Sequence, residues 1–176
     1  TADYTVIGGK DNDFNAGAYC AIFGELNSKT LFIQEGNHCL ISGKDNYNNS
    51  GDYTSISGNN NNNNSGDCCQ ISGSGNSSNS ATGDYTVIGG SANYSNSGNY
   101  CNISGYYNNW NSGTGCIIGG GTNYNNGGDY CQISGDFNWN NGGNYCSISG
   151  RRAASNNLDY ARVHGGNSNA RLIDLV

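Results

Sequence analysis

Glycine and isoleucine recur along the chain at a fixed spacing, and this pattern dominates the arrangement of hydrophobic and polar positions. One glycine per repeat, which we call the anchor glycine, marks eleven copies; eight of the ten intervals are 15 residues, and the others are 19 and 17. A period this short indicates a chain wound into stacked, near-identical coils. The anchor glycines are Gly9, Gly24, Gly43, Gly58, Gly73, Gly90, Gly105, Gly120, Gly135, Gly150 and Gly165.

Two positions before the anchor glycine are nearly uniform in size and polarity. The residue two positions before it is Ile in ten copies and Val163 in the last, and the residue four positions before it is Cys or Thr in ten copies and Ala161 in the last. Residues two apart lie on the same side of a strand, so these two columns predict the buried face of a short strand in each coil. The residue between them varies, from Val6 to Arg162, as expected for a side chain that faces outward.

Asparagine occupies two further columns, three and six residues after the anchor glycine, in nine of eleven copies each. Stacked at the strand spacing of about 4.8 Å, these amides can form hydrogen-bonded ladders along the axis. A 15-residue coil is short for a three-sided prism, so we expect two short strands joined by two tight arcs. The prediction is an all-β, parallel β-solenoid, a two-sheet β-roll of eleven coils, forming a single domain over residues 1–176 with small insertions near residues 25–42 and 77–82.

Composition limits the classes of partner. Only 34% of residues are hydrophobic and 11% are charged, with a net charge of -6. Nucleic acids and anionic membranes both favour a basic face, so we expect neither as a partner. No run of eighteen apolar residues occurs, so we expect no membrane insertion. The absence of Met suggests a mature chain whose signal peptide has been removed, and we therefore expect a secreted, extracellular protein.

The cysteines fit a disulfide framework in an oxidising compartment. Residues one coil apart have Cα atoms close enough for a disulfide, which predicts the pairs Cys20–Cys39, Cys101–Cys116 and Cys131–Cys146. Cys68 and Cys69 fall in one coil and either pair with each other, stay free or reach another molecule. The alternative is a column of small buried thiols that pack as hydrophobic groups.

No group of residues stands out from the repeat as a nucleophile with its base, and the chain has neither C-x-x-C nor paired histidines. We therefore expect no enzyme activity, no catalytic residue, no metal site and no cofactor. The sequence also contains five N-glycosylation motifs on which glycans would be carried if they face outward: Asn48, Asn63, Asn76, Asn93 and Asn102.

Aromatic residues form another column, five residues before the anchor glycine. It holds Tyr in eight coils: Tyr4, Tyr19, Tyr53, Tyr85, Tyr100, Tyr130, Tyr145 and Tyr160. Such a ladder either stabilises the stack, ring on ring, or offers an aromatic edge to a partner rod or a carbohydrate. Tyr47, Tyr94, Tyr124 and Trp139, four residues after the anchor glycine, add aromatic surface on another side.

The two halves of each coil read x-x-C/T-x-I-x-G and x-x-N-x-x-x-x-G. The pattern resembles the half-repeats of grass ice-recrystallisation-inhibition proteins and is similar to the head repeats of trimeric autotransporter adhesins. Both resemblances imply a left-handed parallel β-roll. The first also implies an ice-binding row, for which the candidates are Val6, Ser55, Val87 and Ser147 with the neighbouring Ser and Gly column; Gln70, Gln132, Leu40 and Arg162 interrupt this row.

The ends of the solenoid suggest self-association. Asp174 and Val176 continue the repeat in phase, which predicts the start of a twelfth strand; alternatively the apolar tail folds back over its own core. Open strand edges promote end-to-end stacking. The leading hypothesis is therefore a filament whose joint uses Thr5, Ile7, Leu172, Ile173, Leu175 and Val176, with an ice-binding β-roll second and an adhesin-like or carbohydrate-binding rod third.

Overall fold

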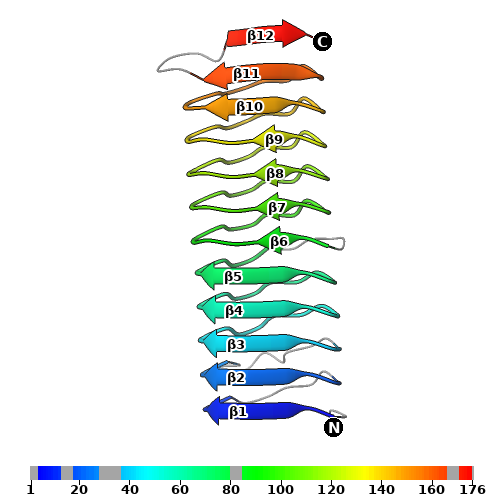
Figure 1. The fold of residues 1–176 in the computed structure, drawn as a ribbon, viewed down its shortest axis with the longest axis vertical. Coiled ribbons are helices and arrows are strands. Elements are labelled where there is room, and N and C mark those ends of the chain that lie inside the picture. The colour runs from blue at the N-terminus through cyan, green and yellow to red at the C-terminus, as the bar shows by residue number, and fades with distance from the viewer. Residues whose placement is uncertain (1–3, 13–17, 28–36, 80–84, 166–170, 176) are drawn as a thin grey trace.

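The computed structural model describes residues 4–12, 18–27, 37–79, 85–165 and 171–175. Its strands form one twelve-stranded sheet whose spatial order follows the chain order, so that the molecule is a straight stack (Figure 1). The strands are β1 (Val6–Lys10), β2 (Ala21–Glu25), β3 (Leu40–Lys44), β4 (Ser55–Asn59), β5 (Gln70–Ser74), β6 (Val87–Ile88), β7 (Asn102–Ile103), β8 (Ile117–Ile118), β9 (Gln132–Ile133), β10 (Ser147–Gly150), β11 (Ala161–Gly165) and β12 (Arg171–Leu175).

The predicted β-solenoid is confirmed. Strands β1 to β11 pair in parallel with the strand of the next coil, and the anchor glycines face one another, as in Gly43↔Gly58. Both predicted inward columns are largely buried: the isoleucines from Ile22 to Ile148 are 1–3% exposed. The column between them faces outward, as Ile117 shows with an exposure of 56%.

Each coil turns at three corners rather than at the two predicted arcs. The residues two and five positions after the anchor glycine, and the residue five positions before the next one, have left-handed backbones; in one coil these are Thr122, Asn125 and Tyr130, each with φ 54°. The side of the coil between the first two corners contributes isolated bridges such as Asn109↔Tyr124 instead of a second sheet. A single residue with left-handed backbone turns the chain sharply. Each corner therefore needs few residues, and 15 residues suffice for a three-cornered coil.

The interior is half polar, because the two asparagine columns point inward. Asn108 is 0% exposed and its Oδ1 accepts the backbone N–H of Asn123 at 3.1 Å, while its Nδ2 donates to the carbonyls of Ser104 (2.7 Å) and Gly120 (3.3 Å). In the second column Asn96 Nδ2 donates to the Asn108 carbonyl at 2.8 Å. The ladders therefore satisfy corner backbone groups that strand pairing does not reach.

The C-terminal tail differs from the expected parallel strand. Strand β12 runs antiparallel to β11, with Ala161 opposite Leu175 and His164 opposite Arg171. The chain turns back on itself, so the alternative interpretation of the tail, in which it folds back, is correct. Because β12 follows β11 after a short connection, the return strand pairs with the edge that β11 leaves open. Most of each predicted insertion (residues 28–36 and 80–84) lies outside the described residues, and so does Val176.

Candidate functional site

The cysteine column forms a row of thiols, most of which donate to a carbonyl of the next coil on the same side of the solenoid. Cys101 Sγ donates to the Gly113 carbonyl at 3.0 Å, and Cys116 Sγ donates to the Gly128 carbonyl at 3.1 Å. Thr54 and Thr86 donate in the same way, through Oγ1, to the corresponding glycine carbonyls. The column accepts either Cys or Thr because each supplies a small side chain with one donor.

The predicted disulfides are not formed: no disulfide joins any of Cys20, Cys39, Cys68, Cys69, Cys101, Cys116, Cys131 and Cys146. The thiols of the column donate to carbonyls, and a thiol sulfur also accepts from the backbone of the next coil; Cys116 N–H, for example, donates to Cys101 Sγ at 3.4 Å. The hydrogen bond from Cys116 lowers the pKa of Cys101 and of Cys131 to about 7, whereas the same contacts raise the pKa of Cys116. Negative charge in this row therefore falls first on Cys101 or Cys131.

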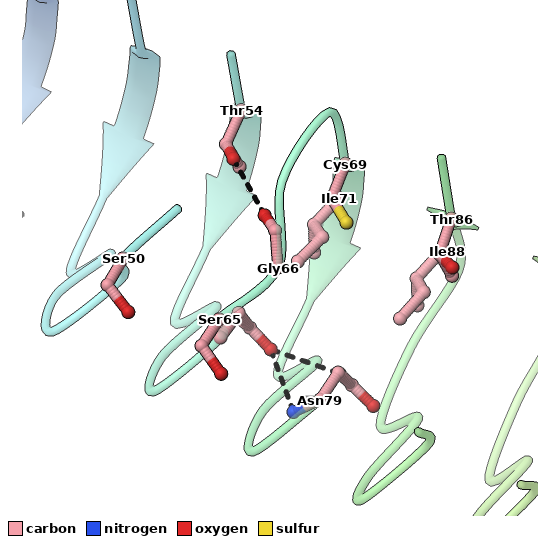
Figure 2. Close-up of a pocket in the computed structure, with 10 residues that line it drawn as sticks. Ser50, Thr54, Ser65, Gly66, Cys69, Ile71, Asn79, Thr86 and Ile88 are labelled. Atoms are coloured by element: carbon pink, nitrogen blue, oxygen red, sulfur yellow. Dashed lines mark hydrogen bonds between the residues drawn. The ribbon is translucent and has the colours of Figure 1, made fainter. Parts of the chain in front are cut away.

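A small hollow lies inside the solenoid between strands β4, β5 and β6 (Figure 2). Its lining is mixed, with Ile71 and Ile88 beside the Thr54 hydroxyl, which donates to the Gly66 carbonyl at 3.1 Å. Asn79 Nδ2 likewise donates to Asn64 Oδ1 at 3.1 Å. These polar groups bond to one another rather than converging on a shared point, so the hollow has the character of a packing defect and not of a catalytic pocket.

The tyrosine column forms stacked runs along one corner, which we call the tyrosine ladder. Rings stack in Tyr4–Tyr19–His38–Tyr53, in Tyr85–Tyr100 and in Tyr130–Tyr145–Tyr160, with centroid separations of 4.7–5.5 Å. Cys68 and Gly115 occupy the two breaks. Stacking covers the faces of the inner rings and leaves edges and hydroxyl groups toward solvent, which supports the stabilising interpretation of this column.

A second aromatic surface, which the sequence analysis identified only in part, lies on the other two corners. We call it the aromatic patch, and it consists of Tyr94, Tyr106, Tyr107, Trp110, Tyr124, Phe137 and Trp139. Trp110 is 60% and Tyr106 is 53% exposed. These residues lie in four consecutive coils, at positions where most other repeats carry non-aromatic residues, and that local departure from the repeat is the sequence signal that could have revealed the whole patch.

The two outward columns of the sheet, one and three residues before the anchor glycine, form what we call the sheet face. Apart from Arg162 and His164 they carry only aliphatic, aromatic, hydroxyl and amide side chains and glycine. The predicted ice-binding row lies here: Val6 is 57% and Val87 is 39% exposed, and Ser55 and Ser147 are half-buried. Gln70, Gln132 and Leu40 are exposed in the same row, so the row is on the surface but mixed in chemistry.

The two ends of the stack differ. Ile7 is 49% exposed, whereas the equivalent isoleucines of the inner coils are 1–3% exposed, and Val163, next to β12, is 2% exposed. The antiparallel pair β11–β12, which we call the C-terminal hairpin, thus covers the isoleucine column at Val163. At β1 the same column is exposed at Ile7. Of the other predicted joint residues, Thr5 is half-buried, and Leu172, Ile173 and Leu175 lie in β12.

The glycosylation motifs divide by burial. Asn76 and Asn93 are both 0% exposed and belong to the inner ladder, where Asn93 N–H and Nδ2 both donate to Asn76 Oδ1 at 3.0 Å. Asn76 and Asn93 do not face outward, because their amides bond inside the solenoid, so the condition set for glycosylation is not met at these two positions. Asn63 and Asn102 are exposed, and Asn48 is half-buried.

Comparisons with known proteins give a distant structural likeness on which neither the fold nor a function is based. No family model matches the sequence, and no curated protein matches it. Among solved structures, the chain is similar to the crystal structure of a UDP-N-acetylglucosamine O-acyltransferase from Moraxella catarrhalis, at 15% identity and a TM-score of 0.32, over 95% of this chain and 72% of that one. A likeness this distant carries no information about activity.

Two further properties of the described residues concern membranes and metals. No helix among them is long and apolar enough to cross a bilayer. Within the same part of the chain, no three His, Cys, Asp or Glu side chains gather where they could hold a metal ion. The candidate sites described above are surfaces of the rod: the sheet face, the aromatic patch and the exposed core column at β1.

Proposed function

We propose that this chain is an extracellular structural rod that joins other copies of itself end to end. The observation that supports the proposal is the open core at β1. Ile7 continues a column that is otherwise buried, yet 49% of it is exposed. Covering it with the end of a second rod would extend the hydrophobic column across the joint.

Backbone groups favour the same contact. Strand β1 (Val6–Lys10) pairs with β2 on one side only, so its outer edge presents N–H and C=O groups that no described strand pairs with. Unpaired edges of this kind template pairing with another chain. One new five-residue pairing combined with burial of Ile7 gives a small, specific joint.

The hairpin changes the predicted geometry of the joint. Since β12 covers β11, the edge available at the other end is the outer edge of β12. A head-to-tail contact then places β1 of one copy against β12 of the next, with Leu172, Ile173 and Leu175 on the partner strand. Because this contact uses two different surfaces, each new copy offers a fresh site and the rod grows into a filament.

The first prediction tests the open end. Replacing Ile7 with Asn should abolish end-to-end association, because the column at the joint would then present an amide to an apolar surface. The control is Val6→Asn on the same strand, since Val6 faces outward and is 57% exposed. The measurement is rod length by negative-stain electron microscopy together with sedimentation velocity.

Wild-type protein and Val6→Asn should form particles several times longer than one rod, which spans about 55 Å for twelve strands. Ile7→Asn should give single rods of that length with an unchanged circular dichroism spectrum. Wild-type protein that remains as single rods at high concentration would contradict the proposal. Dimers that never extend would instead indicate closure between two β1 edges and would contradict head-to-tail growth.

A second candidate, an ice-binding surface, is favoured by the near absence of charge on the sheet face. Charged groups hold water strongly in their own hydration shells, whereas small hydroxyl and aliphatic groups do so weakly. Strands β1 to β11 also lie one above the other along a straight axis, which gives these groups a regular spacing (Figure 1). A regular, weakly hydrated face is the surface that ordered water would need.

The second prediction tests that face. Ser104→Lys places a charge in the middle of the sheet face, where Ser104 is exposed, and should abolish inhibition of ice recrystallisation. The matched control is Asn125→Lys, an exposed corner position on a different side of the rod, which should retain it. The measurement is the rate at which ice grains grow in a frozen sucrose film, which reports recrystallisation. Equal grain growth with and without wild-type protein would rule out this candidate.

A further inference from the structure

Aromatic side chains that break the repeat are concentrated in a single strip of the rod. The aromatic patch occupies positions one, two, four and five after the anchor glycine, in the coils that connect β6 to β10. Both tryptophans of the chain, Trp110 and Trp139, belong to it. In a repeat protein, uniform columns reflect the demands of stacking, so a local departure from them indicates a role that stacking does not explain.

The patch rings are arranged differently from the tyrosine ladder. The rings of Tyr106 and Tyr107 meet edge to face, with centroids 4.2 Å apart and an interplanar angle of 81°. The rings of Tyr94 and Tyr107 do the same, with centroids 6.2 Å apart and an angle of 66°. Tyr124 and Trp139 are stacked with centroids 6.0 Å apart. Rings at steep angles leave faces uncovered, which a continuous stack does not, so the patch offers flat apolar faces to a partner.

The surroundings of the patch are polar and largely uncharged. From Ser91 to Asn125 the strip carries no charged side chain, and further along Asp136 and Arg151 pair at 3.7 Å. Asn125 Nδ2 donates to Asn140 Oδ1, so Asn125 Oδ1 and Asn140 Nδ2 have no partner within the described part of the chain. The strip therefore combines aromatic faces with amide donors and acceptors and presents little net charge.

We infer that the aromatic patch binds a neutral, extended polysaccharide along the axis of the rod. The C–H faces of sugar rings are apolar and pack on aromatic rings, while their hydroxyl groups bond to amides, and the patch offers both kinds of group. The row spans four coils, or about 15 Å along the axis, which suits a straight polymer rather than a single sugar. Nucleic acid could also use stacked rings, but it needs a basic surface, and this chain has a net charge of -6.

The inference is independent of end-to-end assembly, because the patch lies on the side of the rod and the joint lies at its end. A protein that forms single rods could still bind polysaccharide, and a filament could form without doing so.

The third prediction tests the patch with variants that restore the residues of neighbouring repeats. Trp110→Asn introduces the residue found at Asn125 and Asn140, and Tyr124→Asn introduces the residue found at Asn109, so both replacements suit the local backbone. The control is Tyr145→His in the tyrosine ladder, where His38 occurs naturally between stacked rings. The probes are microcrystalline cellulose and chitin in sedimentation assays, and cellohexaose and chitohexaose in solution.

Tryptophan fluorescence is the direct readout, because both tryptophans lie in the patch and a bound oligosaccharide would shift their emission. The wild-type chain and Tyr145→His should bind at least one of the two polymers, and the double variant should lose about tenfold or more in affinity. Binding that survives in the double variant, or fluorescence that does not respond to either oligosaccharide while the polymers are also not bound, would overturn the inference. So would patch-dependent binding to phosphatidylcholine vesicles in the absence of polysaccharide binding.

Discussion

Replacing Gly120 with alanine is expected to destabilise the protein by about 3–5 kcal/mol, the largest effect of any single change considered for this chain. Gly120 has φ 96°, a conformation that residues with a Cβ rarely adopt. A Cβ built there would lie 2.0 Å from the backbone oxygen of Gly135, the anchor glycine of the next coil. Neither coil can move away without breaking the parallel pairing of its strand, so the clash and the backbone strain add.

Gly119, the residue directly before Gly120 in the chain, provides the matched control. A Cβ there would lie 3.5 Å from Ser104 Oγ, which is an ordinary contact, and the equivalent position in other coils carries Ser. Thermal unfolding followed by circular dichroism should show a Tm about 10 °C lower for Gly120→Ala and nearly unchanged for Gly119→Ala. Equal Tm values for the two variants would mean that the anchor glycine is not required for the close approach of the coils.

The second large effect is expected from Asn108→Ala in the inner asparagine ladder. The substitution leaves the Ser104 carbonyl and the Asn123 backbone N–H without their side-chain partner inside a closed section, whereas the Gly120 carbonyl still accepts from the Tyr106 N–H. Each buried group left unsatisfied costs about 1–3 kcal/mol, so the loss at these two groups should lower the free energy of unfolding by about 2 kcal/mol or more. A cavity of amide size adds to this loss.

The control for this variant is Asn102→Ala, an exposed position on β7 whose column already contains Ala21. Urea unfolding should place its midpoint close to that of the wild type, whereas Asn108→Ala should unfold at a clearly lower concentration. Hydrogen exchange would give a sharper readout, because the Asn123 amide should lose protection in Asn108→Ala alone. Retained protection at Asn123 would show that the ladder is not what holds this amide.

Much of the architecture could be predicted because the same residue type recurs at each inward position. Ile and Cys or Thr alternate with variable residues, which specifies the strand and its buried face, and the recurrence of Asn specifies the ladders. The corners were harder to predict. The left-handed positions carry Tyr130, Thr122 or Trp110 rather than Gly, so no composition signal shows a third corner, and the neighbouring coils hold these residues in a conformation that is costly in isolation.

The tail and the cysteines show two other limits of sequence reasoning. Counting residues places Asp174 in phase with the repeat, but phase does not determine strand direction, and β12 runs antiparallel. Sequence spacing also places cysteines one coil apart, within reach of a disulfide, but it does not show that the Cys101 and Cys116 thiols donate to glycine carbonyls of the next coil. The aromatic patch escaped full recognition because its members come from four different columns of the repeat.

The two irregular intervals of the repeat fall on the same side of the coil, and this has a practical consequence. The inner ladder continues across one of them, since Asn93 N–H donates to Asn76 Oδ1 at 3.0 Å although 17 residues separate the two. The other interval follows Asn27, whose Oδ1 accepts the N–H of Asn46 at 3.1 Å across 19 residues. Extra sequence between an asparagine column and the next tyrosine corner therefore leaves the register intact, and that segment is where a foreign peptide could be grafted for display without disturbing the rest of the scaffold.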